Sequence, residues 1–392
     1  MVTRILKPVW PAVVFSRLSP SHYAELPDQP LPSPRWVRVK NYQCGICASD
    51  LSLLTVNADP SIAPAALPGL QRFYLGHELV GEVVEAGAGV TRVRVGDRVI
   101  MDAEGANCLA QEIDPPCSHC VRGDTSLCEN ASAGLEGHNI GGGWSNSYLT
   151  HETSVFAVPD ELNDDQALMV EPLSVGVRAV LRRTPKTGDY VLVLGSGTIG
   201  LCTIQTLRMI SPGCHITAVA RHPHQVAQSR RMGADEVVTG NDLYAATARI
   251  TGAHLYKGLL GNQMLLGGFD VIYDCVGTAR TLQESLRCAK AGGAVVIVGI
   301  QLKPFKLDLT PVWAQEVDLV GTLAHGYDSW QGTWKHDYDL VVNFLCAGKL
   351  TGEGFITHRF SLDRWREAVR TAMDKRSGSI KVVIDHRGTA DG

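Results

Sequence analysis

Three closely spaced cysteines are the clearest candidates for chemistry in this chain. Cys117, Cys120 and Cys128 form a C-x2-C-x7-C pattern that begins after two prolines. Thiols at this spacing favour a structural zinc ion, which takes four tetrahedral ligands. The fourth ligand is predicted to be Asp114, three residues before Cys117, and the alternative is Cys108, nine residues before it. The competing interpretation is a loop that holds three unrelated free cysteines.

A glycine-rich turn in the middle of the chain has the pattern of a dinucleotide site. The apolar run Val191–Leu194 predicts a buried strand, and an apolar helical pattern begins directly after the turn. The turn and the start of the helix hold Gly195, Gly197, Thr198, Ile199 and Gly200. At G-x-G-x-x-G spacing the glycines allow a tight bend and the close approach of a pyrophosphate to the helix N-terminus. The alternative is an ordinary glycine turn.

The end of the next predicted strand bears on which dinucleotide binds. In NAD-binding sheets of this type, an acidic residue at this point bonds the ribose hydroxyls. Here the position is Ala220, and Arg221 and His222 follow it. No carboxylate repels a 2′-phosphate, and Arg221, together with His222, is placed to bind one. The sequence therefore predicts NADP in preference to NAD; the alternative is that Arg221 is a solvated residue before a helix.

Composition restricts the class of protein. The chain has 392 residues, of which 45% are hydrophobic and 19% charged, and its formal net charge is −4. These values are typical of a globular enzyme of two domains. Without a basic block, nucleic acid is not an expected partner, and without an apolar run of about 18 residues no membrane span is expected. Eleven cysteines and no signal-peptide pattern favour a reducing cytoplasm.

The predicted secondary structure that must hold these residues differs between the parts of the chain. Residues 1–175 have short predicted strands with frequent Gly and Pro, as in a small barrel or sandwich. Residues 176–323 alternate strands and helices, which predicts an α/β doubly wound parallel sheet. The predicted strands of this sheet are Tyr190–Leu194, His215–Ala220, Glu236–Val238, Phe269–Asp274, Ala294–Gly299 and Asp318–Gly321. Residues 324–392 are expected to return to the first domain. Segment 251–268 carries five glycines and fits no simple connection in such a sheet.

Three further motifs occur in a fixed order with those above. GICASD holds Cys47 and Ser49, GHELVG holds His77 and Glu78, and EPLSVG holds Glu171. Spacing alone does not assemble these residues into one site. With the cysteine-rich segment and the glycine turn, however, the ordered set resembles the zinc-dependent medium-chain alcohol dehydrogenases, particularly the branch of sorbitol and threonine dehydrogenases. The resemblance implies a GroES-like catalytic domain, with a zinc lobe at about 104–130, joined to a Rossmann domain.

The resemblance also implies roles for individual residues. Cys47, His77 and Glu171 match the three ligands of a catalytic zinc, and Glu78 matches an adjacent acidic residue that is an outer or intermittent ligand. Ser49 matches the hydroxyl that bonds the substrate oxygen. The implied reaction is hydride transfer between NAD(P) and the hydroxyl of a secondary alcohol, polyol or sugar. The small-molecule substrate is the expected partner, and a cytoplasmic homodimer or homotetramer is expected.

The chain departs from the family pattern at two informative positions. Asp114 stands where the family lobe has its first cysteine, and Ser52 stands where many members have a proton-relay histidine. Asp50 matches a position that orients the zinc ligands, whereas Cys44 matches no ligand position and is expected in the core. The alternatives are a zinc-free reductase of quinones or alkenes on the same fold, and a nucleotide-binding structural protein without catalysis.

Overall fold

A mainly antiparallel sheet and a parallel sheet are the two largest sheets of the computed structural model, which describes residues 2–19, 21, 23–67, 73–102, 106–132, 140–240 and 242–388. The chain divides into two units, and positions 104 and 105 of the predicted zinc lobe lie outside the described residues. The first unit comprises Met1–Met169, Leu302–Pro304 and Ile356–Gly392, and the second comprises Val170–Gln301 and Phe305–Phe355.

These divisions differ from the predicted limits near residues 175 and 324. Residues 326–346 stay with the second unit because they pack on α5 (Val170–Arg182), its first helix. Arg178 of α5 lies 3.3 Å from Asp328 and 3.7 Å from Asp337 through one guanidinium nitrogen. The hairpin of β14 (Tyr327–Trp330) and β15 (Thr333–His336) and the helix α11 (Asp337–Cys346) are therefore tied to α5.

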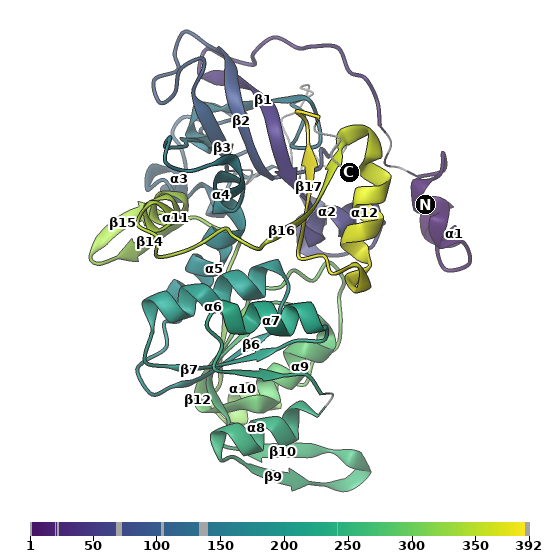
Figure 1. The fold of residues 1–392 in the computed structure, drawn as a ribbon, viewed down its shortest axis with the longest axis vertical. Helices are drawn as coiled ribbons and strands as arrows, with labels where there is room; N and C mark the ends of the chain where they lie inside the picture. Colours follow the sequence, from purple (N-terminus) through teal and green to yellow (C-terminus); the bar gives the residue numbers. More distant parts are fainter. Residues whose placement is uncertain are drawn as a thin grey trace. The chain divides into compact units, whose positions relative to one another are not determined.

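The first unit is built on a mainly antiparallel sheet with β1 (Trp36–Gly45) at its centre (Figure 1). The strand order is β16-β17-β1-β2-β3-β5, and β4 also pairs with β1. The other strands are β2 (Glu78–Ala86), β3 (Arg98–Met101), β4 (Ser147–His151), β5 (Val155–Ala157), β16 (Ile356–Ser361) and β17 (Lys381–Asp385). Val37, Val39 and Cys44 of β1 are fully buried, which confirms the expected core position of Cys44.

Helices of the first unit are short except the one near the C-terminus. They are α1 (Val2–Leu6), α2 (Ala48–Leu54), α3 (Ser118–Val121), α4 (Asp164–Leu168) and α12 (Trp365–Met373). Trp365, Ala368, Val369 and Ala372 of α12 are buried at i, i+3, i+4 and i+7, the spacing of one helix face. That face packs with Ile384 of β17, so the last part of the chain completes the core of the first unit.

The second unit holds the predicted doubly wound sheet. All six strands are parallel, in the order β13-β12-β11-β6-β7-β8. They are β6 (Tyr190–Leu194), β7 (His215–Val219), β8 (Glu236–Val238), β11 (Phe269–Asp274), β12 (Ala289–Ile297) and β13 (Asp318–Gly321). Each predicted strand is confirmed, with β12 beginning earlier than expected. The order is that of a Rossmann fold, with its switch point between β6 and β11.

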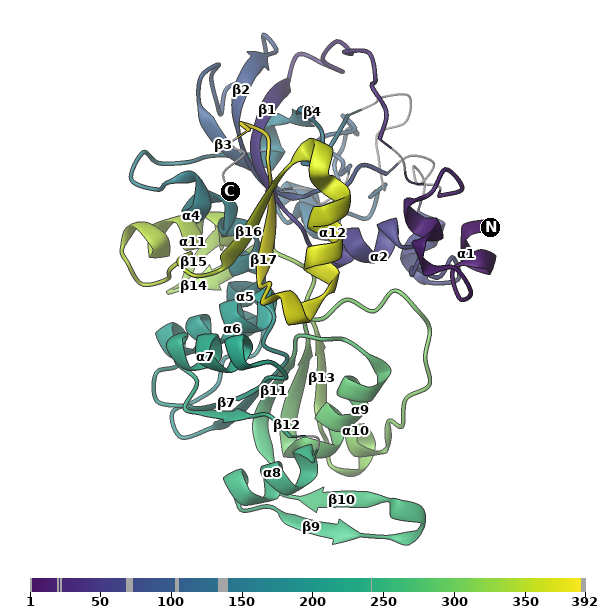
Figure 2. The ribbon, with the colours of Figure 1, turned by 45° about the vertical axis from the view of Figure 1, so that its right-hand side comes forward.

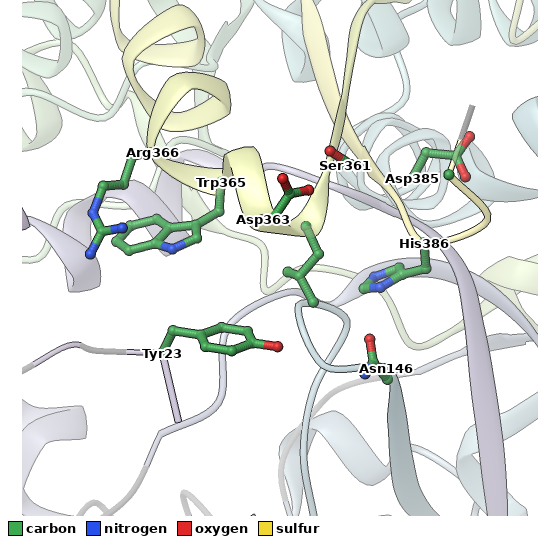
Figure 3. A pocket seen from close by; sticks show the side chains of 10 residues that line it. Tyr23, Asn146, Ser361, Asp363, Trp365, Arg366, Asp385 and His386 are labelled. Atoms are coloured by element: carbon green, nitrogen blue, oxygen red, sulfur yellow. The ribbon is translucent and has the colours of Figure 1, made fainter. Parts of the chain in front are cut away.

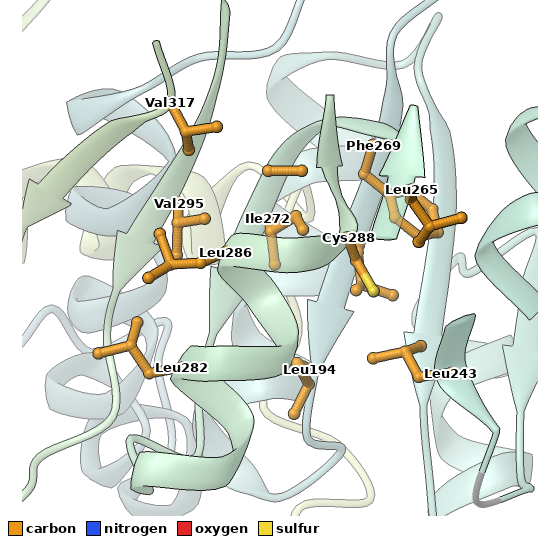
Figure 4. Packing of buried hydrophobic residues seen from close by; sticks show 12 residues of the cluster. Leu194, Leu243, Leu265, Phe269, Ile272, Leu282, Leu286, Cys288, Val295 and Val317 are labelled. Atoms are coloured by element: carbon orange, nitrogen blue, oxygen red, sulfur yellow. The ribbon is translucent and has the colours of Figure 1, made fainter. Parts of the chain in front are cut away.

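Helices cover both faces of this sheet (Figure 2). One face carries α5, α6 (Thr198–Ile210) and α7 (Pro223–Arg231), and the other carries α8 (Leu243–Thr251), α9 (Ala279–Cys288) and α10 (Thr310–Ala314). The core beneath α9 joins Leu282 and Leu286 to Ile272 and Val295 of the central strands (Figure 4). Among the described residues, no helix is long and apolar enough to cross a membrane.

Segment 251–268 forms a β-hairpin rather than an irregular loop. Helix α8 ends at Thr251, and Gly252 follows in the left-handed conformation with φ 73°. β9 (His254–Lys257) then pairs antiparallel with β10 (Gln263–Leu266). The hairpin is an insertion between α8 and β11, which explains why the segment fits no strand–helix connection.

Candidate active site and metal centres

Cys47 lies where β1 gives way to α2. The cysteine precedes the first turn of α2 in an extended conformation, with φ −89° and ψ 157°. The buried carboxylate of Asp50 accepts a hydrogen bond of 3.0 Å from the Cys47 N–H. This bond fixes the start of the helix, and with it the Cys47 side chain and the half-buried Ser49 two residues further on.

Asp50 also connects Cys47 to His77. Its second oxygen accepts a hydrogen bond of 3.0 Å from the Gly76 N–H and lies 3.5 Å from Nδ1 of His77. Burial alone would raise the pKa of Asp50, but His77 and the N–H groups of Gly76 and Cys47 hold that pKa below its usual value. An ionised Asp50 orients the His77 ring, as expected for a residue behind metal ligands.

The ligand atoms of Cys47, His77 and Glu78 lie within 4.8 Å of one another. Together they offer sulfur, nitrogen and oxygen, the donor atoms that zinc takes in proteins. The three residues come from the β1–α2 junction and the start of β2, strands that pair through Gly45 and Glu78. Two sequence motifs that are far apart along the chain therefore meet at one point, and their donors fit a zinc ion.

Glu78 has a second partner that sequence reasoning missed. Lys381 of β17 lies 2.6 Å from Oε1 of Glu78 and also contacts Oε2, and both side chains are buried. A Cβ at Gly45 would overlap the Glu78 carboxylate, so the glycine makes room for it. The available signal was a lone lysine in the apolar strand IKVVI, because a buried lysine needs an acidic partner.

Glu171 belongs to the second unit, where it lies in the first turn of α5 and is buried. Its Oε1 lies 3.9 Å from Nε2 of His325, which in turn lies 3.3 Å from the Tyr338 hydroxyl. Sequence reasoning did not find His325 or Tyr338, and no motif of the chain marks them. The assignment of Glu171 as a zinc ligand is a prediction from the resemblance.

The cysteine lobe gathers four thiols. The Sγ atoms of Cys108, Cys117, Cys120 and Cys128 lie within 4.8 Å of one another, a donor set that fits a tetrahedral zinc ion. Backbone N–H groups of Cys120 and Glu129 lower the pKa of Cys117 to about 6, whereas burial raises the pKa of Cys120. The low pKa of Cys117 favours the thiolate form that binds metal.

Asp114 is not part of this group, contrary to the fourth ligand predicted first. The chain turns back after Cys108, because the N–H of Ile113 donates to the Cys108 carbonyl at 2.8 Å. The Cys117 N–H then lies 3.4 Å from the Cys108 sulfur. This reversal brings Cys108, the alternative candidate for the fourth ligand, to the other three cysteines.

The glycine turn has the form expected of a phosphate cradle. Gly195 adopts φ 103°, a left-handed conformation that favours glycine. A Cβ at Gly200 would overlap the Gly195 carbonyl, whereas a Cβ at Gly197 would meet nothing within 4 Å. Gly197 caps α6, and Thr198 and Ile199 form its first turn with their N–H groups toward the turn. The open side of Gly197 fits a dinucleotide pyrophosphate.

Ala220 is buried at the end of β7, and Arg221 after it is exposed. The N–H groups of Arg221 and His222 both donate to the side chain of Gln225, which fixes the backbone before α7. The rings of His222 and His224 stack with centroids 5.6 Å apart. The exposure of Arg221 leaves this residue accessible to a phosphate.

A polar pocket of the first unit lies apart from these residues. Its volume is about 450 Å³, and Tyr23, Asn146, Asp363, Trp365 and His386 are among its lining (Figure 3). The Tyr23 hydroxyl points into the pocket. Its described lining includes none of the predicted site residues, and we assign it no role.

Comparison with known proteins agrees with the two units. Residues 33–160 match the family model of the alcohol dehydrogenase GroES-like domain, and residues 198–342 match that of the zinc-binding dehydrogenases. L-idonate 5-dehydrogenase of Vitis vinifera is 30% identical over 363 residues, which cover 91% of this chain and 90% of that protein. The chain belongs to the zinc-dependent medium-chain alcohol dehydrogenases.

Two solved structures share the fold across nearly the whole chain. 2R,3R-butanediol dehydrogenase of Bacillus subtilis has a TM-score of 0.70 and 26% identity, covering 92% of this chain and 95% of that one. A Sinorhizobium meliloti protein solved with bound NADP has a TM-score of 0.69 and 26% identity, covering 91% and 93%. The chain is therefore an alcohol dehydrogenase that depends on zinc and a nicotinamide cofactor, and neither alternative from the sequence receives support.

Proposed function

We propose that the protein oxidises a secondary hydroxyl of a polyol, sugar or sugar acid to a ketone, with NADP as the preferred acceptor, and catalyses the reverse reduction. The meeting of Cys47 and His77 beside Glu78 carries this proposal, because these residues supply zinc donors and Ser49 follows Cys47 by two residues. The names of the relatives, which act on idonate and butanediol, support a secondary alcohol.

We propose Cys47, His77 and Glu171 as the ligands of the catalytic zinc, with Glu78 held by Lys381. When bound, zinc supplies a Lewis acid for the alcohol oxygen and the nicotinamide supplies a hydride acceptor. Ser49 accepts the hydroxyl proton of the substrate and passes it outward. Asp50 keeps His77 in one orientation throughout. Ser52 has no titratable group, so it does not store the proton.

The second metal has a structural role in this proposal. Cys108, Cys117, Cys120 and Cys128 hold it, and it orders a lobe whose buried side chains are mostly the cysteines themselves. Thiols available to a metal require a reducing compartment, which supports a cytoplasmic location. Arg221, with His222 beside it, binds the 2′-phosphate of NADP, while the turn at Gly197 binds the pyrophosphate.

A panel of alcohols tests the reaction. Zinc-loaded protein is supplied with L-idonate, sorbitol, 2,3-butanediol and matched primary alcohols, and reduced nicotinamide is followed by absorbance with NAD and with NADP. We expect turnover of at least one secondary alcohol. Ser49→Ala should lower kcat by a factor of about 10²–10⁴, and Ser52→Ala should not change it. The zinc-free alternative would be established by a protein that turns over no alcohol but reduces quinones or alkenes at a rate that chelators do not change.

A further inference from the structure

The hairpin of β9 and β10 presents apolar side chains to solvent. Tyr256, Leu259, Leu260, Met264 and Leu266 form what we call the hairpin patch. Their exposed fractions are 55%, 89%, 105%, 47% and 47%. Surface leucines are common singly, but five large apolar side chains on one projecting hairpin form a patch of the kind that marks an interaction site.

The hairpin packs against the core of the second unit and is hydrogen-bonded to it. Leu265 is 1% exposed and lies in the core of the parallel sheet, and Leu255 opposite it packs against the same core. The Leu265 carbonyl accepts a hydrogen bond of 3.1 Å from Gln315, and Arg287 donates to Asn262 at 3.3 Å. One face of the hairpin is thus anchored, and it projects beyond α8 in both views (Figures 1 and 2).

The register of the two strands identifies the side chains on the solvent face of the hairpin. Tyr256 lies opposite Met264, and His254 lies opposite Leu266. Side chains alternate between faces along a strand, so these residues share the face away from Leu265 and Leu255. A two-stranded sheet with water on this face would ordinarily carry polar residues there. The apolar face is continued by the two leucines at the tip.

Leu260 is the residue that the fold of one protomer explains least. Its φ is 58° and its ψ 28°, a left-handed conformation that glycine and asparagine adopt readily and leucine rarely. The glycine beside it, Gly261, also has a positive φ of 74°. Leu260 gains nothing from burial either, since it is fully exposed. A leucine at this position therefore points to a contact outside the protomer.

We propose that the hairpin patch is an interface between two copies of this chain. Segment 251–268 contains no acidic residue, and Lys257 is its single basic residue apart from His254. In a twofold interface the same patch faces itself, so a patch almost without charge meets its copy without like-charge repulsion. A surface for an anionic membrane would instead carry a cluster of basic residues, which this segment lacks.

The strands add a backbone component to this interface. In the described residues β9 and β10 pair only with each other, so each has an edge that no other strand covers. An uncovered edge pairs readily with a strand of another molecule. In a dimer with a twofold axis, the uncovered strand edges of the two hairpins pair with each other. The same contact buries Leu259 and Leu260 of both copies. The inference is independent of the proposed reaction, because it concerns a surface that carries no site residue.

Particle mass in solution tests the proposal. Light scattering on a sizing column is measured for the full chain, for Leu259→Ser/Leu260→Ser, and for Val95→Ser, which replaces an exposed apolar residue (62%) of the first unit. We expect an oligomer for the unaltered chain and for Val95→Ser. The double variant should fall to half that mass or less, with the dissociation constant raised by at least about a hundredfold.

A second variant separates association from folding. Leu260→Gly removes the side chain and suits the left-handed backbone, so it should raise the melting temperature of the dissociated chain while it weakens association. A monomeric unaltered chain overturns the proposal, and so does an oligomer whose mass neither variant changes. A membrane surface is the other outcome. In that case the unaltered chain is monomeric without vesicles and sediments with phosphatidylcholine–phosphatidylserine vesicles, and the double variant does not sediment. This result would also overturn the proposal.

Discussion

At the scale of single residues, Glu78 is held between two kinds of partner. Its carboxylate lies near the donors of Cys47 and His77, yet both of its oxygens contact Lys381. Both side chains of this pair are almost free of water, with exposed fractions of 1% and 2%. Charges so deeply buried are tolerated only as a pair, because each alone would lose its hydration without compensation. Lys381 thereby holds the Glu78 carboxylate in place beside the proposed metal.

Breaking this pair should cost stability in a recognisable way. Lys381→Met leaves a buried carboxylate unpaired and should lower the free energy of unfolding by about 3–5 kcal/mol. The double variant Lys381→Met/Glu78→Gln removes both charges and should regain much of that loss. Urea unfolding followed by circular dichroism measures both. A double variant no more stable than the single one would show that the pair does not act as a unit.

The candidate site residues were easier to predict from the sequence than the side chains that they contact. The motifs identify Cys47, His77 and Ser49 as candidates because each stands in a short recognisable string. Lys381 meets Glu78 across 303 positions of sequence, a contact that depends on β17 pairing with β1. Long-range pairings of this kind leave only a weak local signal, here a single lysine in an apolar strand.

At the scale of elements, a chain reversal in the cysteine lobe determines which side chain joins the three closely spaced cysteines. Asp114 is nearer to Cys117 in sequence, but the turn after Cys108 brings the more distant thiol to the group. We therefore expect Cys108→Ser to lose one zinc per chain and Asp114→Asn to keep both. Metal analysis of protein purified without chelator makes the comparison. Loss of zinc in Asp114→Asn and not in Cys108→Ser would restore the first prediction.

The junction of β7 and α7 sets the expected choice of cofactor. Buried Ala220 offers no carboxylate to the ribose, and exposed Arg221 offers a cation. A hydrogen bond to a charged group contributes about 1.5–3 kcal/mol, or roughly ten- to a hundredfold in affinity. Arg221→Ala should therefore lower kcat/KM with NADP by that factor and leave the value with NAD unchanged.

Arg230→Ala provides the matched control for this cofactor prediction, since Arg230 is an exposed arginine near the other end of α7. It should alter neither kcat/KM value. An unaltered enzyme that prefers NAD, or an Arg221→Ala enzyme with the original preference, would show that Arg221 does not bind the phosphate.

At the scale of the whole molecule, the alternation of predicted strands and helices identified the sheet of the second unit more accurately than the residues at which that unit begins and ends. Apolar runs separated by helical segments predicted the strands of the parallel sheet, because its central strands β6, β7 and β11 are largely buried between two layers of helices. The second unit extends past the predicted limit near residue 324, and Asp328 and Asp337 lie 3.3 Å and 3.7 Å from Arg178 within it. No local pattern distinguishes a helix that stays in one unit from one that returns to the other.

The two units divide the proposed reaction between them. The first contains Cys47, His77 and Ser49, which we propose act on the alcohol, and the second contains the glycine turn and Arg221, which we propose bind the cofactor. The cysteine lobe belongs to the first unit and has its own metal in this account. Catalytic and structural metals are thus expected to respond independently to substitution.

Zinc content and turnover of Cys47→Ala test the central claim most directly. We predict that zinc falls from two to one per chain, that alcohol oxidation is lost, and that NADPH binding measured by fluorescence is unchanged. Cys44→Ala is the matched control, because Cys44 is a buried core thiol three residues before Cys47, and this variant should keep both metals and activity. A Cys47→Ala protein that retains full turnover, or both zinc ions, would contradict the account.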